Sequence, residues 1–221
     1  MKRTKLCDRQ LPVYSVGEEI TNTATHVLGG LLGAVALILC VRKAAICHGP
    51  VEIAGAAIYG ACLVILYSFS SVYHGLRPSM AKKVMQVLDH CAIYFLIAGS
   101  YSVVCLSAIR WENELLGWGI FAFEWALCLV ATTLTAIDLK RFRVFSMVCY
   151  IGMGWAIIPL AGMLLRIMSP AGFWLLLAGG ISYTIGAILF AMKKKWMHSV
   201  FHVFVVLGSV LQFFAFYRYG L

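Results

Sequence analysis

Seven long apolar runs, separated by short polar connectors, constrain the fold of this chain more than any other feature. They cover approximately residues 24–41, 51–73, 86–108, 115–136, 144–165, 171–192 and 198–217. A helix needs about 20 predominantly apolar residues to cross the hydrocarbon core of a bilayer, and each run has roughly that length. The sequence therefore predicts an all-α, polytopic membrane protein with seven transmembrane helices.

The composition excludes a large soluble core. Of the 221 residues, 62% are hydrophobic and 12% are charged, whereas a soluble domain has about half apolar and about a quarter charged residues. We therefore interpret residues 1–221 as a single transmembrane domain with a cytosolic N-terminal segment, residues 1–23. That segment is basic but lacks the apolar core of a signal peptide, so we expect it to be retained.

The distribution of basic residues predicts the orientation. Thirteen of the 18 Lys and Arg residues lie in the N-terminal segment and in the second, fourth and sixth connectors, and five lie on the other side. Cytosolic loops carry the excess of Lys and Arg in membrane proteins. The sequence therefore predicts a cytosolic N-terminus and an external C-terminus.

The net charge of +9 does not indicate a nucleic-acid partner. The charges cluster between apolar runs, and no basic face is interleaved with aromatic residues of the kind that binds nucleic acid. The eight cysteines are scattered without a CxxC pair, so neither a disulfide framework nor a thiolate zinc site is expected. The sequence carries no signal for an oligomeric state.

The histidines gather at one predicted membrane depth. The stretch "HSVFH" opens the last span, and its i, i+4 spacing places His198 and His202 on one helical face. Ionisable groups inside a membrane are costly and usually mark a function. Five of the six histidines fall at the cytosolic ends of four different spans, namely His26, His74, His90, His198 and His202.

This arrangement favours a zinc site. Three imidazoles and one open position are typical of catalytic zinc, and the HxxxH spacing supplies two ligands from consecutive turns. The third ligand would be His74, and Asp89 lies at the same predicted depth.

Other polar residues near this depth are assigned more modest roles. Zinc ligands need hydrogen-bonded partners that orient them, and we assign Glu19, Asn22 and His26 to this supporting role. His90 follows Asp89 and so points about 100° away from it on a helix, which favours a structural role or at most a supporting one. Glu124, near the middle of the fourth span, is interpreted as a structural carboxyl group bonded to a neighbouring helix, or else as part of a polar pathway.

Several motifs together resemble a known family. They are "EEITNTATH", "SSVYH", "LDHCAIYFLIAGSY", "YIGMGW" and "HSVFHVFVVLGSVLQFFA". With these motifs, the chain resembles the bacterial haemolysin III–type members of the progestin and adipoQ receptor family. The resemblance implies a seven-helix fold with an intramembrane zinc ion held by His74, His198 and His202. It implies that Asp89 holds or activates the attacking water and that Ser70 lies beside the site, and we predict both as catalytic residues.

The resemblance extends to alkaline ceramidases, which cleave lipid amides. The leading hypothesis is a zinc-dependent hydrolase of lipid amides or esters, with a membrane lipid as substrate, in the plasma membrane of a bacterium. The alternative is a non-enzymatic receptor or regulator of lipid homeostasis, in which zinc is structural and a lipid is a ligand. A lytic activity, carried only by the family name, and metal transport rank lower.

Overall fold

The computed structural model describes residues 3–192 and 194–221. Within these residues all regular structure is helical, with no strand. Seven segments are long and apolar enough to cross a membrane, which confirms the seven predicted spans. They are Val16–Cys47, Pro50–Gly75, Met80–Glu112, Glu114–Ile137, Arg143–Ile167, Ser169–Ala191 and Met197–Gly220. Lys2 and Lys193, two of the basic residues behind the predicted orientation, lie outside the described residues.

Four of these spans are single α-helices: α1 (Val16–Cys47), α2 (Pro50–Gly75), α5 (Glu114–Ile137) and α8 (Ser169–Ala191). The third span is α3 (Met80–Val104), the π-helical segment η2 (Cys105–Ile109) and α4 (Arg110–Glu112). The last span is α9 (Met197–Ala215) followed by the π-helical η4 (Phe216–Gly220). A short 3-10 turn, η1 (Leu6–Asp8), precedes the bundle.

The fifth span is broken near its middle. It consists of α6 (Arg143–Trp155), the 3-10 turn η3 (Ile158–Leu160) and α7 (Ala161–Ile167). Pro159 lies in the turn, and proline removes a backbone donor and clashes with the preceding helical turn. The break therefore has a local cause in the sequence.

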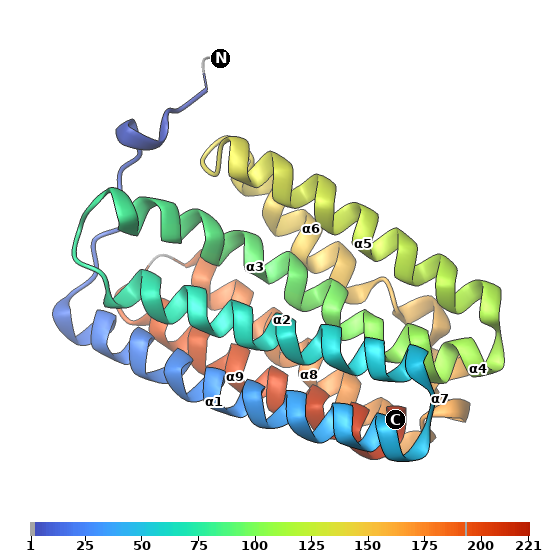
Figure 1. The fold of residues 1–221 in the computed structure, drawn as a ribbon. Helices are drawn as coiled ribbons and strands as arrows, with labels where there is room; N and C mark the ends of the chain where they lie inside the picture. Colours follow the sequence, from blue (N-terminus) through green and yellow to red (C-terminus); the bar gives the residue numbers. More distant parts are fainter. Residues whose placement is uncertain (1–2, 193) are drawn as a thin grey trace.

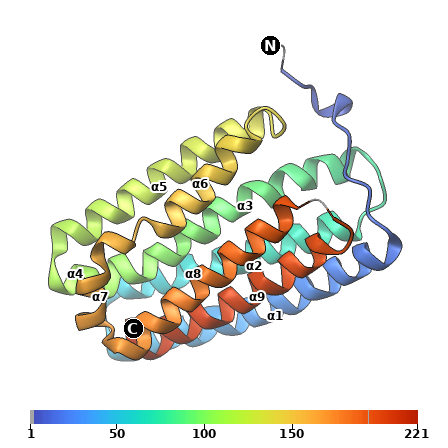
Figure 2. The ribbon, with the colours of Figure 1, turned by 180° about the vertical axis from the view of Figure 1, so that it is seen from behind.

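The spans form a bundle in which α3 lies between α2 on one side and α5 on the other (Figures 1 and 2). In an apolar 18-residue stretch of the third span, 83% of the residues are buried, against 17% in the corresponding stretch of the fifth span. Helix α3 is therefore central and α6 is peripheral. The two chain ends lie at opposite ends of the bundle (Figure 1). Helix α9 packs on α1 and α8, which brings the last span beside the first.

Close contact between α1 and α2 depends on glycine. A Cβ atom at Gly60 would lie 2.5 Å from the Cα of Leu37, and one at Gly29 would lie 2.5 Å from the ring of Tyr67. Small residues let membrane helices approach closely, and the resulting van der Waals packing is one of the main forces that hold helices together in lipid. The two helices that carry Glu19 and His74 are therefore held at short range.

The beginnings of α1 and α9 are joined at the same end of the bundle. Ser15 caps α1 in a capping box with Glu18, and the backbone N–H of Trp196 donates to Glu18 Oε1 over 2.7 Å. The preceding segment crosses the end of α5, where the backbone N–H of Thr4 donates to the Asp138 carboxylate over 2.8 Å. This bond lowers the pKa of Asp138. The N-terminal segment is thereby anchored beside the histidine-bearing ends of the helices.

Candidate metal centre

The three histidines predicted as ligands lie together. His74 is in the last turn of α2, and His198 and His202 occupy the first two turns of α9. His198 Nε2 is 3.1 Å from His74 Nε2 and 3.0 Å from His202 Nε2. Ligand atoms of all three lie within 4.8 Å of one another, and all three residues are buried. The structure thus brings together residues separated by most of the chain.

The partners of His74 and His202 determine which ring nitrogen carries the proton. His74 Nδ1 lies 2.6 Å from Glu19 Oε2, and a carboxylate oxygen can only accept, so Nδ1 carries the hydrogen. His202 Nδ1 lies 3.3 Å from the backbone oxygen of Asn22, which also only accepts. In both rings the Nε2 atom therefore presents its lone pair, and both lone pairs face His198 Nε2.

This geometry fits a metal ion. A hydrogen on His198 Nε2 can point at only one of the two neighbouring lone pairs, and without that hydrogen three lone pairs would face one another. A cation among the three nitrogens removes that conflict. In a tetrahedral zinc site with Zn–N bonds of about 2.0–2.1 Å, ligand nitrogens lie about 3.3 Å apart, close to the observed spacing. The three residues could hold Zn²⁺.

Helix α1 supplies three side chains that contact the ligands. Glu19, Asn22 and His26 lie on one face of α1 because they are three and four residues apart. Asn22 Oδ1 accepts from Ser199 Oγ over 2.7 Å, and Asn22 Nδ2 lies 3.3 Å from His74 Nδ1, a contact between two donors because that nitrogen donates to Glu19. The ring of His26 stacks on that of His202, with centroids 3.6 Å apart. Each of the three therefore contacts a ligand or the residue beside it.

Asp89 and Ser70 lie near the histidines but outside the ligand group. Both line a cavity together with His26, His198 and His202. The Asp89 carboxylate is buried and is not one of the three grouped ligands. Ser70 is 1% exposed, and its Oγ has no hydrogen-bond partner within the described part of the chain. Two buried polar groups therefore face the cavity without belonging to the ligand set.

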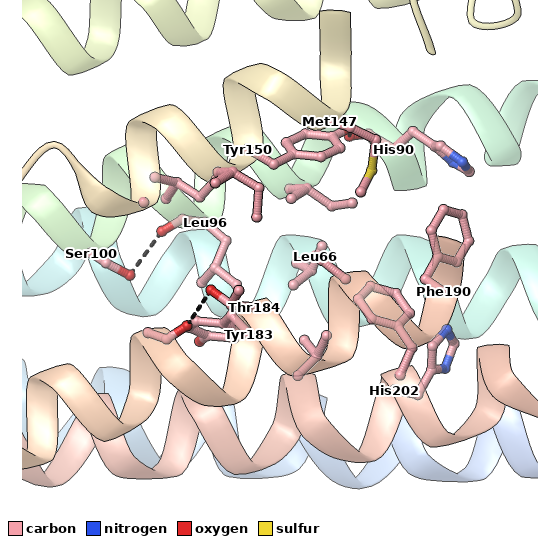
Figure 3. Close-up of a pocket in the computed structure, with 18 of the residues that line it drawn as sticks. Leu66, His90, Leu96, Ser100, Met147, Tyr150, Tyr183, Thr184, Phe190 and His202 are labelled. Carbon is pink, nitrogen blue, oxygen red and sulfur yellow. Dashed lines mark hydrogen bonds between the residues drawn. The ribbon is translucent and has the colours of Figure 1, made fainter. Parts of the chain in front are cut away.

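The cavity continues away from the histidines into apolar surroundings. It lies among α3, α6, α8 and α9, with Phe190 and His202 at one end and Ser100 and Thr184 at the other (Figure 3). Between these ends its wall includes Leu66, Leu96 and Met147. Two exposed residues of α6, Ile151 and Gly154, also line it, so the cavity is open at α6.

His90 lies at the edge of this cavity. Its Nδ1 is 2.8 Å from the backbone oxygen of Gln86 and 3.5 Å from Asp89 Oδ2. The ring therefore bonds mainly to its own helix and could support Asp89 only weakly.

Sequence reasoning missed two residues that contact the site. Lys82 was counted only among the basic residues that predict the orientation. It is 3% exposed, and its Nζ lies 2.6 Å from Glu19 Oε1. Tyr14 covers the cluster, with its ring centroid 4.9 Å from that of His198 and 5.7 Å from that of His74. Burial raises the pKa of the Tyr14 phenol, which therefore stays neutral. The one sequence signal was proximity along the chain, since Tyr14 lies shortly before the "EE" stretch and Lys82 lies shortly after "SSVYH".

The expectation that Glu124 bonds to a neighbouring helix was wrong. Glu124 lies on α5 and is 0% exposed. Neither carboxyl oxygen has a hydrogen-bond partner among residues 3–192 and 194–221. Helix α5 packs against α3 and η2 of the third span, so Glu124 is buried at this contact without a hydrogen bond in the described part of the chain.

Comparisons with known proteins cover nearly the whole chain. A family model described as "Haemolysin-III related" matches residues 14–213. The chain is 38% identical over 201 residues to Hemolysin-3 of Bacillus cereus, covering 90% of each protein. It is 34% identical over 203 residues to a Hemolysin-3 homolog of Bacillus subtilis (strain 168), covering 91% of this chain and 94% of the relative.

Proposed function

The chain belongs to the haemolysin III-related family, and on that premise we propose that it is a zinc-dependent hydrolase that cleaves lipid amides or esters within the membrane. One observation carries the proposal. Three buried histidines lie grouped together, and two of them, His198 and His202, line one end of a cavity whose remaining wall is largely apolar. This combination suits a substrate with a polar, cleavable group and a long apolar tail.

The cavity supports a lipid substrate. One polar end contains Asp89, Ser70, His198 and His202, and the wall beyond His202 includes the apolar side chains of Leu66, Leu96 and Met147 (Figure 3). The opening at Ile151 and Gly154 gives an acyl chain a route from the surrounding bilayer. A water-soluble substrate would gain little from such a wall. The scissile bond would then lie near the histidines and the acyl chain along α3 and α8.

Each residue at the polar end has a distinct task in hydrolysis. A Zn²⁺ ion held by His74, His198 and His202 would supply Lewis acidity toward a carbonyl group and a nucleophile at neutral pH. Asp89 accepts the proton of the attacking water as general base. Ser70, whose hydroxyl has no other partner in the described residues, donates to the oxygen of the scissile group. Glu19 keeps His74 in the tautomer that leaves Nε2 free.

The ligand set favours catalysis over a purely structural metal. Structural zinc sites have four protein ligands, whereas catalytic sites have three and leave one position open. Within the described residues no fourth His, Cys, Asp or Glu joins the three histidines. Two of the three, His198 and His202, also line the cavity. An open position on that side would face the substrate.

We expect purified wild-type protein to contain about one zinc per chain and to release fatty acid from ceramides or simple lipid esters, since three ligands with an open position are the catalytic pattern. A chelator should abolish turnover, and added Zn²⁺ should restore it. His48→Ala, which changes a histidine at the far end of α1, serves as the control and should behave as wild type. A zinc-loaded protein with no turnover on these lipids, but with a large loss of thermal stability on chelation, would favour the structural role of zinc.

We further propose that the protein lies in a bacterial plasma membrane with its N-terminus in the cytosol and its C-terminus outside. The excess of Lys and Arg on the N-terminal side supports this orientation. A phosphatase reporter fused after Leu221 should be active, because it folds only outside the cytosol, and a fluorescent protein fused to the N-terminus should fluoresce. A silent C-terminal phosphatase would contradict the orientation.

A further inference from the structure

We propose that Lys82 is a positioning residue for the metal centre. Its ammonium group bonds to Glu19, which holds the imidazole of His74, and to the backbone oxygen of His74 itself. This inference rests on the metal site proposed above. Lys82 does not touch the ligand nitrogens, and its effect passes through Glu19 and through the C-terminal end of α2. It is therefore separate from the ligand set and from the catalytic residues.

The Lys82 ammonium group is fully engaged by three parts of the bundle. Its Nζ donates to Glu19 Oε1 over 2.6 Å, to the backbone oxygen of Leu76 over 2.9 Å and to that of His74 over 3.4 Å. It also lies 5.1 Å from the ring centroid of Tyr73. An ammonium group has three hydrogens to donate, and three protein oxygens receive them. Lys82 thus links α1, α2 and α3 at one point.

The location of Lys82 is costly for a lysine, which indicates that its contacts matter. Lysine is almost never fully buried unless it is paired, and Lys82 is 3% exposed. It also lies in the first turn of α3, three residues after the cap Ser79, where the helix dipole disfavours a positive charge. The compensation comes from α2, because the last carbonyls of that helix lack helical partners and carry partial negative charge.

Glu19 links Lys82 to the side chain of His74. One carboxylate oxygen accepts from Lys82 and the other from His74 Nδ1. The Glu19 side chain is 23% exposed, so without Lys82 it could turn toward solvent. Lys82 therefore keeps Oε2 directed at the imidazole, while its bond to the His74 carbonyl holds the backbone of the same residue. Both contacts keep His74 Nε2 in place.

The neighbouring Lys83 provides a matched control. It carries the same charge, lies one residue away and bonds to the backbone oxygen of Cys7 instead of to Glu19. Lys82→Met keeps the apolar stem and removes the charge and all three donors, and Lys83→Met makes the same change without touching the site. Lys82→Arg restores charge and donors and tests for rescue.

The experiment measures the zinc dissociation constant by chelator competition and the absorption spectrum of the Co²⁺-substituted protein. Loss of residues that orient metal ligands typically costs about 10–100-fold in affinity, and we expect a loss in that range for Lys82→Met together with an altered Co²⁺ spectrum. Lys83→Met should match wild type, and Lys82→Arg should recover part of the affinity. Combining Lys82→Met with Glu19→Gln should cost less than the two separate losses multiplied, because both act on His74.

The possible failures are distinguishable. If wild type binds neither zinc nor Co²⁺, the proposed metal centre is wrong. If wild type binds zinc tightly and Lys82→Met binds it equally well with an unchanged Co²⁺ spectrum, the metal centre stands and the role of Lys82 is overturned. Equal losses of zinc affinity in Lys82→Met and Lys83→Met would also overturn it, since the removal of any nearby positive charge would then explain the loss. If Lys82→Met does not fold, Lys82→Gln, which keeps a donor, replaces it in the same comparison.

Discussion

Replacement of either His198 or His202 with alanine is expected to remove most of the bound zinc. Each contributes one of the three grouped Nε2 atoms, and His198 Nε2 makes short contacts with both others. The remaining pair would form a poor site, because protein zinc sites rely on at least three protein ligands. Elemental analysis of each purified variant against wild type measures the loss.

The same variants should also be less stable. Metal binding energy is folding energy when the site exists only in the folded state, so each variant should melt at a lower temperature than wild type and should no longer respond to a chelator. His48→Ala again controls for the loss of a histidine outside the site. Full zinc retention in both His198→Ala and His202→Ala would refute the assigned ligands.

Asp89→Asn is expected to lower lipid hydrolysis by about 10²-fold or more, the scale on which general-base catalysis contributes. Asparagine keeps nearly the same shape but cannot accept the proton of water. Because the Asp89 carboxylate lies outside the ligand group, zinc content and melting temperature should change little. Product formation, zinc content and melting temperature are measured on the same preparations.

Asp138→Asn is the matched control for this change. Asp138 is also buried, but it binds the backbone of Thr4 and does not line the cavity. It should retain full turnover. Undiminished hydrolysis by Asp89→Asn would exclude Asp89 as the base, and loss of zinc from that variant would show that Asp89 is needed to hold the metal instead.

The spans could be predicted from sequence because length and apolarity alone define them. Their ends were less predictable. Helix α1 begins at Val16, eight residues before the predicted run, because Ser15 caps it and its first polar turns are covered by α2 and α9. The break at Pro159 had a sequence signal, whereas the π-helical segment Cys105–Ile109 had none that we recognised.

For the site, the sequence predicted only the depth of each residue in the membrane. Helical rise places His74 and His202 at one depth, but depth does not say which way a side chain points around its helix. The grouping of the three histidines, the position of Asp89 outside that group and the lack of a partner for Glu124 all depend on helix rotation. Lys82 was missed for a related reason, since a charge near a loop was interpreted as facing the cytosol.

The bond between Glu18 and the Trp196 backbone joins the beginnings of the first and last spans. The site is therefore assembled from both ends of the chain, and this has a consequence for biosynthesis. Membrane segments emerge from the ribosome in order, and the candidate ligands come from the second and seventh segments, with support from the first. A nascent chain that lacks α9 has only His74, held by Glu19, and no ligand set. Metal capture would therefore follow insertion of the final helix, and a prematurely terminated chain would lack two of the three candidate ligands.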